Sequence, residues 1–236
     1  MIRSFLILNI FFFAGIILAQ DTIPAPSQEE KILDSLYRED QFYVGITFNL
    51  LWNRPAEISQ SGFSGGLHIG YTRDMPINKR RNLAIGLGLG YSVNTYGQNL
   101  FIGEDENTGQ SLFTNLEDAD YDRNRFTTQL LESPLEFRWR TSIPETHKFW
   151  RIYTGLRVGY LYSFNSNFEQ SDNDVQQSKI DELNRWRIGT TFTFGWNTFN
   201  FHFYYSLNPF FNSDALIEEE KVGLNVVKIG LMFYIL

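Results

Sequence analysis

From Phe42 to the end of the chain, hydrophobic and polar residues alternate over long stretches. Side chains of an extended strand point alternately to its two faces, so a period of two predicts strands with one apolar face. In the last stretch, Gly223–Leu236, the odd-numbered positions from 227 to 235 are apolar, whereas Lys228 and Gly230 fall on the other face. The chain therefore ends on a predicted strand.

Eight segments with this alternation follow one another. They cover Phe42–Trp52, Phe63–Arg73, Leu83–Tyr96, Phe126–Thr141, Phe149–Phe164, Arg185–Trp196, Phe199–Asn208 and Gly223–Leu236. Each reaches the roughly 9–11 residues that a tilted strand needs to cross a bilayer. Long connections at 53–62, 97–122, 165–184 and 210–221 alternate with short ones. This pattern predicts an all-β fold, an eight-stranded antiparallel transmembrane up-and-down β-barrel.

The two faces of the predicted strands differ in composition. A soluble, lipocalin-like barrel is the alternative, but it would bury its apolar face inward. Four tryptophans lie on the apolar face near strand ends, as membrane-interface girdles require. They are Trp139, Trp150, Trp186 and Trp196. We therefore predict that the apolar face meets lipid and that the polar face lines the lumen.

The predicted lumen face carries glycines beside charged residues. The charged and titratable members are Glu132, Glu136, Arg138, Arg140, Arg151, Arg157, Arg187, His202 and Lys228. Eight strands enclose a space that side chains can just fill, so we expect the arginines to pair with Glu132 and Glu136 in a closed polar network. Because bases outnumber acids on this face, an anion-binding lumen is the alternative. The glycines at alternate positions of Leu83–Tyr96 predict bulky side chains close by.

The N-terminal part of the chain differs from the strands. Arg3 followed by the apolar run Phe5–Leu18 predicts a secretory signal peptide over residues 1–19. Residues 20–41 are polar, and the capping-box spacing of Ser27–Glu30 predicts a short helix within them. The even strand number predicts that both termini of the barrel, residues 42–236, lie in the periplasm of an integral outer-membrane protein.

Composition excludes several classes of function. The net charge of −7 argues against nucleic acid, and the absence of cysteine excludes thiolate catalysis and Cys-based zinc sites. His202 and Ser206 share a strand face, but a rise of ~3.3 Å per residue separates them by about 13 Å, too far for proton transfer. The acidic loop residues between 104 and 122 do not follow an EF-hand spacing. We therefore predict no catalytic residue, no metal and no cofactor.

The last strand resembles the terminal strand by which bacterial outer-membrane barrels are recognised for insertion. The similarity lies in a polar Lys228, a glycine at Gly230 and apolar residues at Phe233 and Ile235, with Leu236 following. It implies a transient partnership with the barrel-assembly machinery.

A second resemblance lies in the fourth predicted strand. The segment Leu130–Arg140 resembles the Leu-Glu-x-Pro-Leu segment of small Bacteroidetes outer-membrane barrels, the PorT-like or "porin family" group. Arg38–Tyr43 and Gly86–Tyr91 are similar as well. The resemblance implies an eight-stranded outer-membrane barrel with an accessory role in type IX secretion, and it offers no catalytic residues.

Three hypotheses for function follow. The first is a non-enzymatic barrel that acts by contact with secretion-system or other outer-membrane proteins, surrounded by outer-membrane lipid. The second is a narrow pore or a small-solute binder, and the third is a lipid-modifying enzyme.

Overall fold

The computed structural model describes residues 38–105, 109–141, 149–171 and 173–235. The predicted signal peptide and the predicted helix lie outside this range. Within it, no helix has the length and apolarity needed to cross a membrane.

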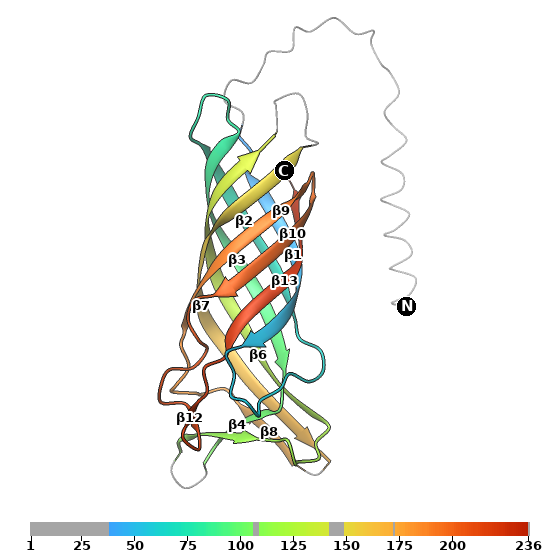
Figure 1. Cartoon of the computed structure of the whole chain (residues 1–236), viewed down its shortest axis with the longest axis vertical. Helices are drawn as coiled ribbons and strands as arrows, with labels where there is room; N and C mark the ends of the chain where they lie inside the picture. The colour runs from blue at the N-terminus through green and yellow to red at the C-terminus, as the bar shows by residue number, and fades with distance from the viewer. Residues whose placement is uncertain (1–37, 106–108, 142–148, 172, 236) are drawn as a thin grey trace, which may run out of the picture. The chain divides into compact units, whose positions relative to one another are not determined.

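Eight antiparallel strands form the wall of a closed barrel (Figure 1). They are β1 (Gln41–Trp52), β2 (Gly65–Pro76), β3 (Leu83–Gly97), β6 (Arg123–Arg140), β7 (Trp150–Gln170), β9 (Trp186–Trp196), β10 (Phe199–Ser206) and β13 (Asn225–Ile235). Each of these eight strands pairs with the wall strands that precede and follow it along the chain. The barrel closes where the first, β1, pairs with the last, β13, from Phe42↔Ile235 to Trp52↔Asn225. The predicted eight-stranded antiparallel barrel is confirmed.

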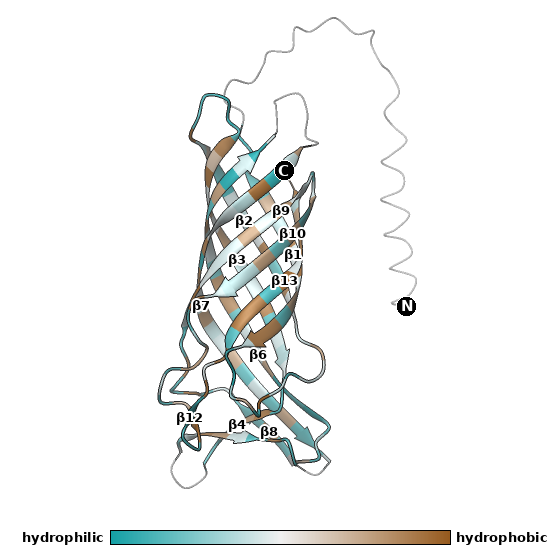
Figure 2. Cartoon of the chain, in the orientation of Figure 1, coloured by the Kyte–Doolittle hydropathy of each residue, from teal (hydrophilic) through white to brown (hydrophobic). Residues whose placement is uncertain are grey.

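The outward face of the wall is apolar and aromatic. Phe42, Leu131 and Trp150 are 60%, 58% and 53% exposed, while the residues that alternate with them are buried. Hydrophobic residues recur along the strands of the wall, as the brown segments of Figure 2 show. A soluble protein rarely exposes so continuous an apolar surface, whereas a barrel in lipid requires it.

The connections gather at two ends of the barrel. The short turns 77–82 and 197–198 lie at one end, the turn end. The long connections 53–64, 98–122, 171–185 and 207–224 lie at the other, the loop end, which is at the bottom of Figure 1. Short and long connections therefore alternate along the chain, as the sequence predicts.

The long connections contain short strands that the alternation did not predict. β4 (Leu100–Glu104) and β5 (Ser111–Asn115) form a hairpin, β8 (Asn173–Gln177) pairs with β7, and β11 (Leu216–Ile217) pairs with β12 (Glu220–Lys221). Apolar residues stand next to one another in these hairpins, as Leu100, Phe101 and Ile102 do in β4, so the hairpins lack the two-residue apolar period by which the wall strands are recognised.

The interior changes character along the barrel. The fifth predicted strand was expected to end at Phe164, but β7 continues to Gln170, and its register with β6 shifts between Gln129 and Leu130. Beyond this bulge, apolar side chains join the inward-facing polar ones and form the loop-end core. It comprises Leu51, Ile58, Tyr96, Leu100, Ile102, Phe113, Phe126, Leu130, Leu161, Phe164, Ile180, Leu183, Phe210, Phe211, Ala215, Val222, Leu224 and Val226.

The strand β2 extends beyond its predicted end. The second strand was expected to end at Arg73, with Asp74 in a turn, but β2 runs to Pro76 and Asp74 pairs with Gly86 of β3. Proline is tolerated at this last position, where one ladder hydrogen bond fewer is needed. Asp74 therefore points into the barrel.

Candidate functional site

The lumen of the wall is filled with charged side chains. All nine residues expected there point inward and are buried: Glu132, Glu136, Arg138, Arg140, Arg151, Arg157, Arg187, His202 and Lys228. They come from β6, β7, β9, β10 and β13, at positions that alternate with outward apolar residues.

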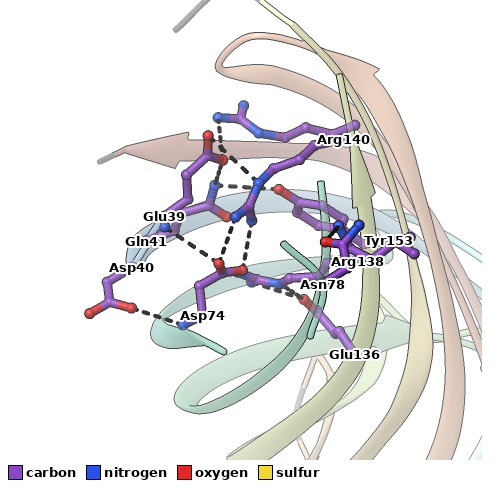
Figure 3. Close-up of polar contacts among 11 residues, drawn as sticks. Glu39, Asp40, Gln41, Asp74, Asn78, Glu136, Arg138, Arg140 and Tyr153 are labelled. Carbon is purple, nitrogen blue, oxygen red and sulfur yellow. Dashed lines mark hydrogen bonds and ion pairs between the residues drawn. The ribbon is translucent and has the colours of Figure 1, made fainter. Parts of the chain in front are cut away.

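Three arginines and three carboxylates meet near the turn end. This turn-end cluster comprises Glu39, Asp74, Glu136, Arg138, Arg140 and Arg151. In Figure 3, Arg140 reaches across to Asp74, and its two terminal nitrogens each donate to one carboxylate oxygen at 2.8 Å. Such a bidentate pair is the strongest geometry available to an arginine and a carboxylate.

Arg138 connects the cluster across the lumen. Its Nε donates to Glu136 at 3.0 Å, and its NH1 lies 3.5 Å from Asp74 Oδ1. Its guanidinium also lies 4.7 Å from the centre of the Tyr153 ring. Gly86 leaves room for it, because a side chain at Gly86 would overlap the Arg138 guanidinium.

The residues just before β1 close this end. Glu39 is fully buried and lies 3.9 Å from Arg140 Nε and 3.8 Å from Arg151 NH2. Gln41 donates to the Glu39 carboxylate at 3.3 Å and to the Tyr153 hydroxyl at 3.4 Å. Glu39, two residues before β1, is thus part of the ionic network.

A second group lies deeper in the lumen, around Glu132. Arg157 NH1 is 3.4 Å from the Glu132 carboxylate, and His68 Nδ1 is 3.8 Å from it. The other nitrogen of His68 lies 3.0 Å from the Thr47 hydroxyl. Lys228 Nζ donates to Asn94 Oδ1 at 2.7 Å. Side chains from β1, β2, β3, β6, β7 and β13 therefore meet in this group.

The Tyr43 side chain accounts for the presence of glycine at two positions of the neighbouring strands. A side chain at Gly70 of β2 or at Gly90 of β3 would overlap the Tyr43 ring or hydroxyl. This is the close approach of a bulky side chain that the glycines of the third strand predict.

The ion pairs differ from the expected ones at two acidic residues. Sequence reasoning assigned Glu39 to the N-terminal segment and Asp74 to a turn, so it counted only Glu132 and Glu136 as partners of the arginines. Asp74 lies an even number of residues after His68 and Thr72, whose side chains the alternation predicts to face inward. Extending the alternation by one residue beyond Arg73 would therefore have predicted that Asp74 also points into the lumen. No comparable signal exists for Glu39, since it lies before the strand begins.

His202 and Ser206 do not meet. His202 Nδ1 lies 2.7 Å from the Thr193 hydroxyl, and the Ser206 hydroxyl accepts the Val226 N–H at 2.7 Å. In the part of the chain that the structure describes, no three His, Asp or Glu side chains are placed to hold a metal.

The residues of the expected insertion signal divide between the two faces of β13. Lys228 is buried in the lumen, whereas Phe233 and Ile235 face outward and Ile235 is 52% exposed. The Phe233 ring lies 5.7 Å from that of Phe199 on β10.

A closed antiparallel wall with an apolar outside and buried ions inside defines a transmembrane β-barrel. A family model described as "Outer membrane protein beta-barrel domain" matches residues 19–212, and the chain belongs to this family. The protein is therefore a small outer-membrane β-barrel. No curated protein matches the chain.

Proposed function

We propose that this barrel is not an enzyme and works by contact, as a structural or accessory component of an envelope assembly. The occupied ends of the barrel carry the proposal, since the turn-end cluster lies at one end and the loop-end core at the other. An eight-stranded wall encloses little more space than side chains can fill. The outer wall and the loops are then the surfaces available to other molecules.

Type IX secretion is the assembly that we propose. The support is the resemblance of Leu130–Arg140 to the PorT-like barrels of Bacteroidetes, and this segment supplies Glu132, Glu136, Arg138 and Arg140 to the lumen. The partners would be secretion-system subunits, with lipid around the wall and the barrel-assembly machinery acting during insertion.

Affinity purification tests this proposal. The tagged protein is extracted from native outer membranes in mild detergent, and its partners are identified by mass spectrometry. Secretion-system subunits in fixed proportion are the expected result, with an unrelated eight-stranded barrel carrying the same tag as the control. Recovery of the barrel alone would refute the assignment to secretion.

Bilayer conductance separates this proposal from a narrow pore. With Arg138 and Arg140 fully buried in ion pairs, we expect the reconstituted barrel to be silent. A steady single-channel conductance from the wild-type barrel would favour the pore.

Lipid analysis separates it from a lipid-modifying enzyme. His202 is 1% exposed and lies on the lumen side of the wall, away from the lipid-facing surface. We therefore expect overexpression to leave lipid A unchanged. A change in lipid A that disappears in His202→Ala would overturn the non-enzymatic assignment.

We further propose that the turn end faces the periplasm, with both termini there, because outer-membrane barrels place short turns on that side. The test is protease treatment of intact cells, which should cleave a tag inserted in loop 207–224 and spare one in turn 77–82. The reverse pattern would overturn this orientation.

A further inference from the structure

Charge is balanced in one part of the lumen and unbalanced in the other. The turn-end cluster holds three arginines and three carboxylates. Around Glu132, the buried cations are Arg157, Arg187 and Lys228. Glu136 also acts on Arg157 but is already paired with Arg138, so among the described residues outside the turn-end cluster Glu132 is the one buried carboxylate there. His68 and His202 are also buried there, but a histidine adds either no charge or a positive one. This part of the lumen therefore has two more cations than anions.

Within the described part of the chain, several N–H groups of these three cations lack a protein acceptor. Lys228 has three ammonium protons, and among the described residues one acceptor across the barrel, Asn94 Oδ1, receives a hydrogen bond from it. Arg187 NH2 and Arg157 Nε are buried without a protein acceptor. Arg187 NH1 donates to the Pro209 carbonyl oxygen, which carries no full charge to neutralise the guanidinium.

These donors lie around a common region. Lys228 is within electrostatic range of Glu132, Arg157 and Arg187, and its Nζ lies 5.1 Å from the centre of the Tyr204 ring. Lys228, Glu132 and Tyr204 keep 5%, 5% and 7% of their surface accessible inside the lumen, whereas neighbouring Asn49 and Asn94 keep none. Some space is therefore left beside the charged groups.

An uncompensated buried cation is expensive. Removing an ion from water remains costly even after the protein relaxes, and buried charges in proteins are almost always paired. Two surplus cations would strongly destabilise the barrel unless a negative charge joined them. The geometry points to a small inorganic anion, such as chloride, bound in the lumen at Lys228 and facing Arg157 and Arg187.

The first test compares two sodium salts. The midpoint of thermal unfolding of the purified full-length barrel is measured in detergent micelles, in chloride and in gluconate at equal ionic strength, with gluconate as the bulky organic anion for comparison. At about ten times its dissociation constant, chloride should shift the equilibrium roughly tenfold toward the folded barrel. Equal midpoints in the two salts would overturn the proposal. A neutral Lys228 amine, which needs no counterion, would give this result.

The matched variants are Lys228→Met and Lys221→Met. Lys228→Met removes a surplus cation while keeping a long side chain, so the dependence on chloride should disappear or fall sharply. Lys221 is exposed on β12, and its replacement should leave the chloride effect unchanged. A chloride effect of the same size in Lys228→Met would refute the assignment of this lysine.

Bromide soaking of crystals provides a readout that does not depend on a variant folding. An anomalous peak within hydrogen-bond reach of Lys228 Nζ is expected. The absence of a peak in the lumen at saturating bromide would refute the site.

Discussion

Asp74 and Arg140 form a two-pronged ion pair inside the barrel although 66 residues separate them in the chain. They belong to β2 and β6, which are not neighbours, since β3 lies between them. The pair spans β3 at the level where Gly86 stands opposite both Asp74 and Glu136. Glycine at this position leaves the space that the neighbouring Arg138 guanidinium fills. The ion pair thus links three strands at one level of the wall.

Replacing Asp74 by alanine should be among the most destabilising changes in the lumen. It leaves Arg140 without its bidentate partner and weakens the contacts of Arg138, both fully buried. Loss of one member of a buried pair typically costs about 3–5 kcal/mol. Urea unfolding of the barrel in micelles measures it. As a control, Glu169→Ala removes the partner of Arg123 in an exposed pair and should barely move the midpoint.

Glu39→Ala should cost less than Asp74→Ala. The Glu39 carboxylate stands 3.8–3.9 Å from its arginine partners, whereas Asp74 makes two contacts of 2.8 Å with Arg140. We expect a loss of roughly 1–3 kcal/mol in the same urea experiment. A loss as large as that of Asp74→Ala would mean that the segment before β1 anchors the turn end more strongly than these distances imply.

Gly90→Ala should destabilise the barrel because its Cβ would overlap the Tyr43 hydroxyl. Overpacking of this kind costs about 1–3 kcal/mol. Introducing Tyr43→Phe removes the oxygen and should recover part of the loss. Gly159→Ala is the matched control, since its Cβ would meet side-chain carbons of Leu130 and Glu132 at 3.2 and 3.4 Å and the Leu131 carbonyl oxygen at an ordinary 3.6 Å. Equal losses at the two glycines would contradict the steric explanation.

Phe126→Ala should loosen the loop end. Its ring is fully buried, with centroids of Tyr96, Phe164 and Phe210 at 4.8, 5.4 and 5.3 Å. Truncating a buried phenylalanine costs about 3–5 kcal/mol. Limited proteolysis should then cut loop 207–224 faster, while the wall strands stay protected. Leu112→Ala, at a position 42% exposed on β5, should leave the cleavage rate unchanged.

Phe233→Ala should reduce assembly in cells more than it affects refolding of the purified chain. Its partner Phe199, in ring contact with it on the outward face, is the control, because Phe199→Ala removes the same contact outside the terminal strand. The measurements are the amount of folded barrel in isolated membranes and the yield of refolding in micelles. Similar assembly of both variants would show that the barrel-assembly machinery does not recognise the terminal strand through Phe233.

The sequence alone determined the strands and the direction of their side chains. Alternation is a local property of an extended backbone, so a window of about ten residues fixed the outward position of Leu131 and the inward position of Glu132. For the same reason all nine predicted lumen residues lie inside the barrel. The alternation failed where polarity no longer marks the faces, as in the β4–β5 hairpin, and beyond the bulge in β7.

Only the tertiary structure decided which lumen residues meet. The partner of Arg140 depends on the tilt and stagger with which eight strands close into a barrel, and these are properties of the whole sheet. The sequence therefore offered Glu132 and Glu136 as partners, whereas closure brought Asp74 and Glu39 to Arg140. Closure also separated a balanced turn-end cluster from the surplus of cations around Lys228, because side-chain direction is set locally and contacts across the lumen are not.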